Sequence, residues 1–238
     1  MDNLTDLKIS GMGKTAGGKF RDIKISGNGE IEGDVQANTL NISGMGKVSG
    51  KTVAEKISVS GMGTLSGDVK CSSIKGSGSL LIDGFLAADI LHASGSISVR
   101  NGIKSRYIRS SGYINSGDGV EAEEFRSRGE FNISGLLNAN NVDVVFGWRS
   151  YAGEIGGEDI RIRHMKYMLS FILSIFGKKD RLETDLIEGN NIMIEYACAK
   201  TIRGNNIMIG DNCLVDLVEY SGKLEISPSA VVKNKVKV

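Results

Sequence analysis

The feature that most constrains the fold of this chain is a repeat with a period of about 17 residues. The phrase Ile-Ser-Gly-Met-Gly begins at Ile9, returns at Ile42, and recurs with valine in first place at Val59. A second glycine series, from Gly33 to Gly135, keeps the same period. Regular self-similarity of this kind indicates a repeat architecture. The first glycines of the units are spaced by 17 residues on average and are Gly11, Gly27, Gly44, Gly61, Gly76, Gly95, Gly112, Gly129 and Gly147.

Apolar and polar residues alternate within each unit. Examples are Ile23-Lys24-Ile25, Ile57-Ser58-Val59 and Val142-Asp143-Val144. A period of two indicates short strands with one buried face, and glycine or asparagine between them suits corners. Three such strands fill one coil of a parallel β-helix, whereas helical repeats need about 33 residues or more. The sequence therefore predicts an all-β parallel β-solenoid with about 17 residues per coil.

Composition removes several classes of protein. The chain has 32 glycines but one proline, which excludes collagen and disordered Pro/Gly-rich chains. Lys+Arg is 29 and Asp+Glu is 28, so no overall field attracts nucleic acid, and we expect no nucleic-acid partner. Three cysteines and the lack of an export signal in Met1–Ser10 favour reduced thiols in the cytoplasm. No apolar stretch reaches the roughly 18 residues that span a bilayer.

The repeat pattern breaks after about Ile160, which predicts a β-helix block over 1–160, an insertion over 161–181 and a second β-helix block over 182–238. The insertion holds six basic residues and one acid. Its apolar centre predicts a short amphipathic helix, which either packs on the solenoid or lies in a membrane interface. The candidates for membrane contact are Met168, Leu169, Phe171, Ile172, Leu173, Ile175, Phe176, Lys178 and Lys179.

The C-terminal block repeats with a period of 15. The run beginning Gly189-Asn190-Asn191 returns as Gly204-Asn205-Asn206, and stacked asparagine amides can bond along such a ladder. Cys198 and Cys213 have the same spacing, which places them on adjacent coils. Small buried thiols are favoured over a metal site, because no nearby histidine or further cysteine completes tetrahedral coordination.

Catalytic chemistry has little support in the sequence. There are two histidines, His92 and His164, and the Gly-x-Gly pairs precede strands rather than helices. We therefore predict no catalytic residue, no cofactor and no metal site. The alternative is a hexapeptide-repeat acyltransferase, because Ile209–Cys213 and Ile226–Val231 resemble that family's turns. That architecture requires a period of 18 and a catalytic histidine at a subunit groove.

The repeats also resemble those of a known family. Ile-Ser-Gly-x-Gly, together with Gly33-Asp34-Val35, Gly67-Asp68-Val69 and the block Gly204–Val232, is similar to the bactofilins, and more narrowly to the longer polymer-forming cytoskeletal proteins of Gram-positive bacteria. The resemblance implies a right-handed β-helix that polymerises without nucleotide. It implies scaffold roles in cell shape, envelope assembly or motility. The implied partners are a second copy of the chain, a paralogue, and the inner face of the cell membrane.

The two ends of a β-helix carry unpaired backbone groups that can pair with another chain. Both ends of this sequence are apolar and typical of strands. Lys233, Lys235 and Lys237 alternate with the terminal valines and would limit pairing there. We predict a non-enzymatic scaffold built by end-to-end stacking, with a monomer capped by the insertion or lysine tail as the alternative. The candidates for the polymer interface are Leu4, Leu7, Ile9, Val231, Val232 and Val236.

Overall fold

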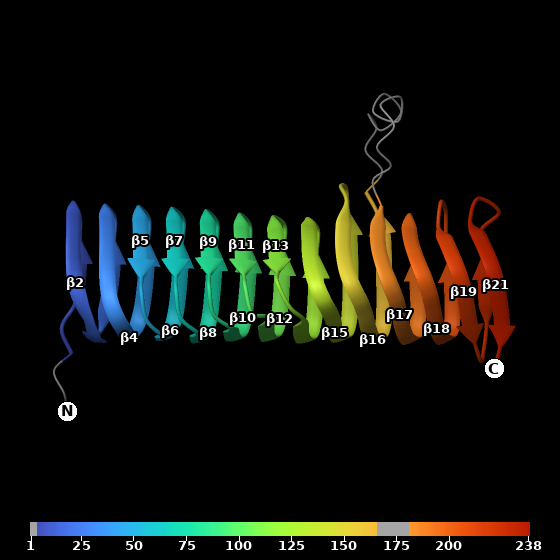
Figure 1. The fold of residues 1–238 in the computed structure, drawn as a ribbon, viewed down its shortest axis with the longest axis horizontal. Coiled ribbons are helices and arrows are strands. Elements are labelled where there is room, and N and C mark those ends of the chain that lie inside the picture. The colour runs from blue at the N-terminus through green and yellow to red at the C-terminus, as the bar shows by residue number, and fades with distance from the viewer. Residues whose placement is uncertain (1–3, 166–180) are drawn as a thin grey trace, which may run out of the picture. The chain divides into compact units, whose positions relative to one another are not determined.

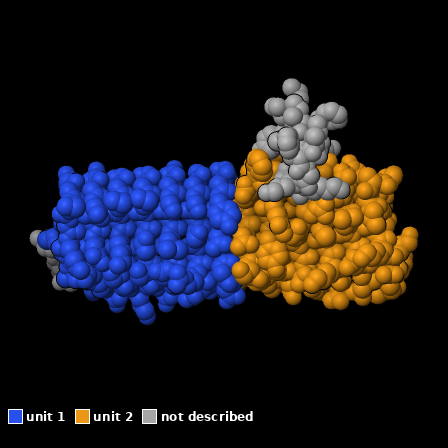
Figure 2. All heavy atoms as spheres, turned by 45° about the horizontal axis from the view of Figure 1, so that its top comes forward, with its two compact units in different colours: residues 1–118 blue, residues 119–238 orange. Residues whose placement is uncertain are grey.

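The computed structural model of the chain describes residues 4–165 and 181–238. Every regular element in these residues is a β-strand, so they contain no helix able to cross a membrane. Two compact units are distinguished, residues 1–118 and 119–238 (Figure 2). The predicted amphipathic helix, with every candidate for membrane contact from Met168 to Lys179, lies outside the described residues.

Unit 1 is a parallel β-solenoid in which each strand pairs with strands of the neighbouring coils. Leu7 pairs with Ile23 one coil later, and Ile57 pairs in the same way with Ile74. Figure 1 shows β5, β7, β9, β11 and β13 side by side along one face of this unit. Its strands are β1 (Leu7–Ile9), β2 (Met12–Lys19), β3 (Asp22–Ile25), β4 (Asn28–Ile42), β5 (Met45–Val48), β6 (Thr52–Val59), β7 (Met62–Leu65), β8 (Val69–Gly76), β9 (Ser79–Ile82), β10 (Leu86–Ala93), β11 (Ser96–Val99), β12 (Ile103–Ser110) and β13 (Tyr113–Ser116).

Unit 2 has the same architecture with a less regular period. Val142 pairs with Ile160 and Ile192 pairs with Ile207, so the step from one coil to the next is shorter in the second case. The strand that contains Ile160 runs on to His164. The prediction of an all-β parallel solenoid with about 17 residues per coil is confirmed. The strands of unit 2 are β14 (Val120–Ser127), β15 (Glu130–Phe146), β16 (Ser150–His164), β17 (Leu182–Ile194), β18 (Ala197–Ile209), β19 (Leu214–Tyr220), β20 (Leu224–Ile226) and β21 (Val231–Lys237).

The core consists of columns, by which we mean residues at the same register position in successive coils. Most inward positions carry β-branched or aliphatic side chains that are almost completely buried. Burial of one such side chain stabilises the fold by about 1.5–3 kcal/mol, and its repetition explains how a chain with few aromatic residues builds a core. One column of unit 1 contains Leu7, Ile23, Leu40, Ile57, Ile74, Leu91 and Ile108.

A column of glycines marks one corner of unit 1. The amide of Met45 donates a hydrogen bond of 2.9 Å to the carbonyl of Gly27, and a β-carbon on Gly44 would lie 2.1 Å from that same oxygen. Only glycine permits this close approach of successive coils. The sequence-based assignment of Gly76 to this series is wrong, because Gly78 occupies the corner and Gly76 lies in the core. The close contacts repeat at Gly27, Gly44, Gly61, Gly78, Gly95 and Gly112.

Candidate assembly edges

The first coil of unit 1 leaves one side of its strands unpaired. Among the described residues, β1 pairs with β3 and β2 with β4, and neither has a second partner strand. We call the open side of β1 and β2 the N-terminal edge. Leu7 and Ile9 begin two core columns there, Leu7 half-buried and Ile9 8 % exposed, and Leu4 is an exposed residue before β1. This edge therefore combines free backbone hydrogen-bonding groups with apolar side chains.

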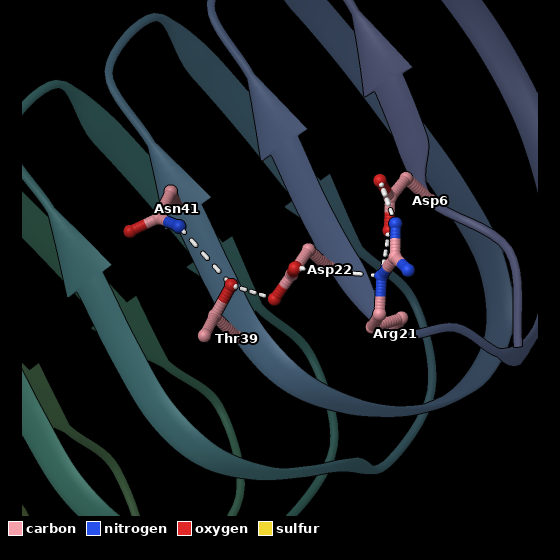
Figure 3. Close-up of polar contacts among 5 residues, drawn as sticks. All are labelled: Asp6, Arg21, Asp22, Thr39 and Asn41. Carbon is pink, nitrogen blue, oxygen red and sulfur yellow. Dashed lines mark hydrogen bonds and ion pairs between the residues drawn. The ribbon is translucent and has the colours of Figure 1, made fainter.

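A polar network holds this first coil onto the next two (Figure 3). Arg21 Nε and Nη2 donate to the two carboxylate oxygens of Asp6 at 2.8 and 2.7 Å, and Arg21 Nε lies 3.9 Å from Asp22 Oδ2. The Thr39 hydroxyl donates to Asp22 at 2.6 Å, and the Asn41 amide donates to Thr39 at 3.3 Å. The hydrogen bonds from Arg21 lower the pKa of the Asp6 carboxyl below its ordinary value. These contacts fix the position of the first coil, and with it the N-terminal edge, relative to the next two coils.

The last coil of unit 2 is open in the same way. Among the described strands, β20 pairs with β18 and β21 with β19, and each has that one partner. We call the open side of β20 and β21 the C-terminal edge. Three half-buried apolar residues, Leu224, Ile226 and Val232, end core columns at this edge. Leu224 and Ile226 are not among the candidates from the sequence, although a step of 17 residues from Ile207 and Ile209 reaches them.

The other two predicted valines lie on the outer surface of the C-terminal strand. Val231 pairs with the exposed Leu214 and is itself 54 % exposed. Val236 pairs with Glu219 and is 46 % exposed. A shallow groove of about 380 Å³ runs beside Val231, Leu214 and Lys233. Of the three C-terminal candidates, Val232 is the one whose position continues the core.

The three terminal lysines have different surroundings. Lys233 Nζ lies 2.8 Å from an oxygen of Asp216, and Lys237 Nζ lies 6.0 Å from the centre of the Tyr220 ring. Lys235 instead pairs in register with Val218, whose side chain is completely buried. Lys235 therefore stands at the end of a core column, where the side chains before it are all apolar. That column contains Val120, Leu137, Ile155, Ile187, Ile202 and Val218.

The predicted asparagine ladder is present in unit 2. Asn191 Nδ2 donates to Asp159 Oδ1 at 2.8 Å, and Asn206 Nδ2 donates to Asn191 Oδ1 at 3.0 Å. Asn206 Oδ1 then accepts a hydrogen bond of 3.3 Å from the backbone amide of Lys223. The ladder therefore links four successive coils through hydrogen bonds on their outer surface. It stabilises the coils that precede the C-terminal edge.

The prediction of buried thiols is confirmed for Cys213 and is wrong for Cys198, which is half-buried; Cys71 is buried. Cys198 and Cys213 are on adjacent coils as predicted, although Cys198 pairs in register with Leu214, the residue after Cys213. Burial raises the pKa of the Cys71 thiol to about 12 and that of Cys213 to about 11. A thiol held protonated is a poor nucleophile and a poor metal ligand.

The two histidines lie in different surroundings. His92 is exposed on β10 between Lys75 and Arg109 of the neighbouring coils. His164 ends β16 and stacks on the ring of Tyr196, with 4.3 Å between ring centres. Within residues 4–165 and 181–238, no three or more metal-binding side chains gather into a group.

The chain is similar to two curated proteins of Bacillus subtilis (strain 168). It is 39 % identical to the uncharacterized protein YhbE over 107 residues, which covers 44 % of each chain. It is 31 % identical to the uncharacterized protein YhbF over 105 residues, covering 44 % of this chain and 42 % of YhbF. The match thus spans less than half the length of either relative. No known protein-family profile and no solved structure matches the chain.

Proposed function

We propose that this protein is a non-enzymatic scaffold that assembles by end-to-end contact of its terminal solenoid coils, without nucleotide. The observation that carries the proposal is the pair of open edges, each with unpaired backbone groups and apolar core positions such as Leu7 and Val232. A solenoid that remains a monomer normally covers its last coil with a polar cap. The resemblance to the polymer-forming bactofilins, cytoskeletal proteins of the cytoplasm, favours the same function.

Electron microscopy of the purified protein at near-physiological salt, without nucleotide or metal, tests the proposal. We expect filaments or sheets. Arginine at an edge position, in Leu7→Arg or Val232→Arg, should shorten or abolish them, because stacking would bury the new charge. The control is Val53→Arg, an outward and 44 % exposed position in the middle of unit 1. Discrete trimers in place of filaments would instead point to the acyltransferase alternative.

Membrane association is a second part of the proposal. It depends on Met168–Lys179, where the sequence combines apolar residues with basic flanks. Such a segment binds anionic bilayers by burying its apolar side chains and by electrostatic attraction, which contributes about 1 kcal/mol for each Lys or Arg near the surface. In sedimentation with vesicles that contain anionic lipid, the wild-type protein should pellet with the vesicles and the Phe171→Glu variant should stay in the supernatant. Equal sedimentation of both proteins would remove this segment as the anchor.

A further inference from the structure

The two edges differ in one respect that bears on how copies of the chain join. The first coil of unit 1 carries no charged residue in its described core positions, which are Leu7, Ile9, Gly13, Thr15 and Gly18. The last coil of unit 2 ends its core columns with three apolar residues and one lysine, Lys235. A charge at an inward position of an edge strand is a recognised means of preventing edge pairing.

We infer that Lys235 opposes strand pairing at the C-terminal edge. Two copies of this chain therefore join first through their N-terminal edges. The inference deepens the proposed function and rests on it. Two ends allow three contacts between copies: N-terminal with N-terminal, N-terminal with C-terminal, and C-terminal with C-terminal. Two of the three place Lys235 between Val218 and the incoming coil. Burial of an unpaired ammonium there opposes both.

The surroundings of the lysine support this assignment. Lys233 is ion-paired with Asp216, and Lys237 lies over the ring of Tyr220, so both charges have partners on the outer surface. No ion pair to Lys235 occurs among the described residues. A coil that stacks on this edge would therefore cover the Lys235 ammonium while unit 2 supplies no ion-pair partner for it among the described residues.

The N-terminal edge carries a smaller desolvation cost. Asp6 accepts hydrogen bonds from Nε and Nη2 of Arg21. Lys14 Nζ lies 2.5 Å from a carboxylate oxygen of Glu32 and 3.6 Å from one of Glu30. The charges of Asp6 and Lys14 therefore have partners within unit 1, and Lys8 and Lys19 are exposed and outside the core columns, so two N-terminal edges can meet around Leu7 and Ile9. Such a contact is self-complementary and closes at the dimer. Longer assemblies then grow through the weaker C-terminal edge, where Leu224, Ile226 and Val232 still offer apolar surface.

The test compares five proteins by sedimentation velocity over a concentration series, with electron microscopy of the same samples: wild type, Lys235→Val, Lys233→Val, Leu7→Arg and Val232→Arg. Lys233→Val is the matched control, since it removes a neighbouring charge that has an outer partner. We expect a wild-type dimer before filaments, a monomer for Leu7→Arg, and a persistent dimer for Val232→Arg. Lys235→Val should form filaments at a concentration at least about tenfold lower than wild type, and Lys233→Val at the wild-type concentration.

The outcomes separate this inference from the proposed function. A dimer that survives Leu7→Arg but not Val232→Arg would place the first contact at the C-terminal edge and overturn the inference while the scaffold stands. Equal filament thresholds for Lys235→Val and wild type would do the same. If no variant assembles, the proposed function itself fails. Circular dichroism monitors folding, and Thr15→Arg replaces Leu7→Arg if that protein is unfolded.

Discussion

Leu80 is the register partner of Gly63 in the next coil. At this step the large side chain moves from one core column to the adjacent core column. A β-carbon on Gly63 would lie 3.1 Å from Val59 Cγ1, and one on Gly76 would lie 2.8 Å from Ile97 Cγ1. The two columns therefore share one space, and each coil fills it from one side only. The first column reads Ile9, Ile25, Ile42, Val59, Gly76 and Ala93, and the second reads Gly13, Gly29, Gly46, Gly63, Leu80 and Ile97.

This exchange predicts strong coupling between Val59 and Gly63. Gly63→Leu should destabilise by about 1–3 kcal/mol through overpacking, and Val59→Gly by a similar amount or more through a cavity. The double variant recreates the Gly76 and Leu80 arrangement, so its loss should be smaller than the sum by about 1–3 kcal/mol. Urea unfolding of the four proteins measures the coupling. Additive losses would mean that the two columns do not share space.

The glycine corner gives a second prediction. Gly44→Ala places a methyl group 2.1 Å from the Gly27 carbonyl oxygen, so the coils must separate, and we expect a loss of about 1–3 kcal/mol. Gly11→Ala is the matched control. It belongs to the same column in the first coil, and a β-carbon there has no atom within 4 Å. Thermal unfolding should lower the midpoint for Gly44→Ala and leave that of Gly11→Ala nearly unchanged. Equal midpoints would contradict the corner argument.

The asparagine ladder gives a prediction that depends on pH. Asn191→Asp replaces the donor to Asp159 with a second carboxylate, so like charges face each other in adjacent coils. We expect a loss of about 1 kcal/mol at pH 7, part of which returns below about pH 4 as the carboxylates become protonated. Asn190→Asp adds the same charge one residue earlier, outside the ladder. Denaturant titrations at both pH values should show the larger effect, and the acid recovery, in Asn191→Asp alone.

The buried thiols predict a loss of stability in alkali. The Cys71 pKa is raised from 9.0 to about 12 and the Cys213 pKa from 9.0 to about 11, with burial as the main cause. The unfolded chain then releases these protons first, so the free energy of unfolding falls as the pH rises from 9 toward 11 or 12.

Cys71→Ala should reduce the slope of that alkaline loss. Alanine suits the position, since the register partners of Cys71 are Ala54 and Ala88. Unfolding measured between pH 8 and 11 gives the slope, and a thiol reagent at pH 8 should modify the half-buried Cys198 well before the other two cysteines. Rapid modification of all three thiols in the folded protein would refute the prediction.

Local spacing was sufficient to predict the fold, because each coil repeats the same alternation of buried and exposed residues. The same is true of the Asn191 and Asn206 ladder, since identical amides one period apart stack in register. Spacing alone does not distinguish Gly76 from Gly78 as the corner residue, because the two glycines stand close together. Packing distinguishes them: Gly76 leaves room for Ile97, whereas Gly78 lies against the carbonyl of Gly61.

The sequence by itself therefore determined the architecture, the period and the apolar character of both ends. Tertiary structure alone decided which lysine occupies a position that continues a core column. Lys233, Lys235 and Lys237 alternate and would lie on one face of a straight strand. The preceding strand shows why they do not: Val215 and Val218 are both buried although an odd number of positions separates them, which requires a corner between them. β21 follows the same register, so Val232 and Lys235 take the two core positions.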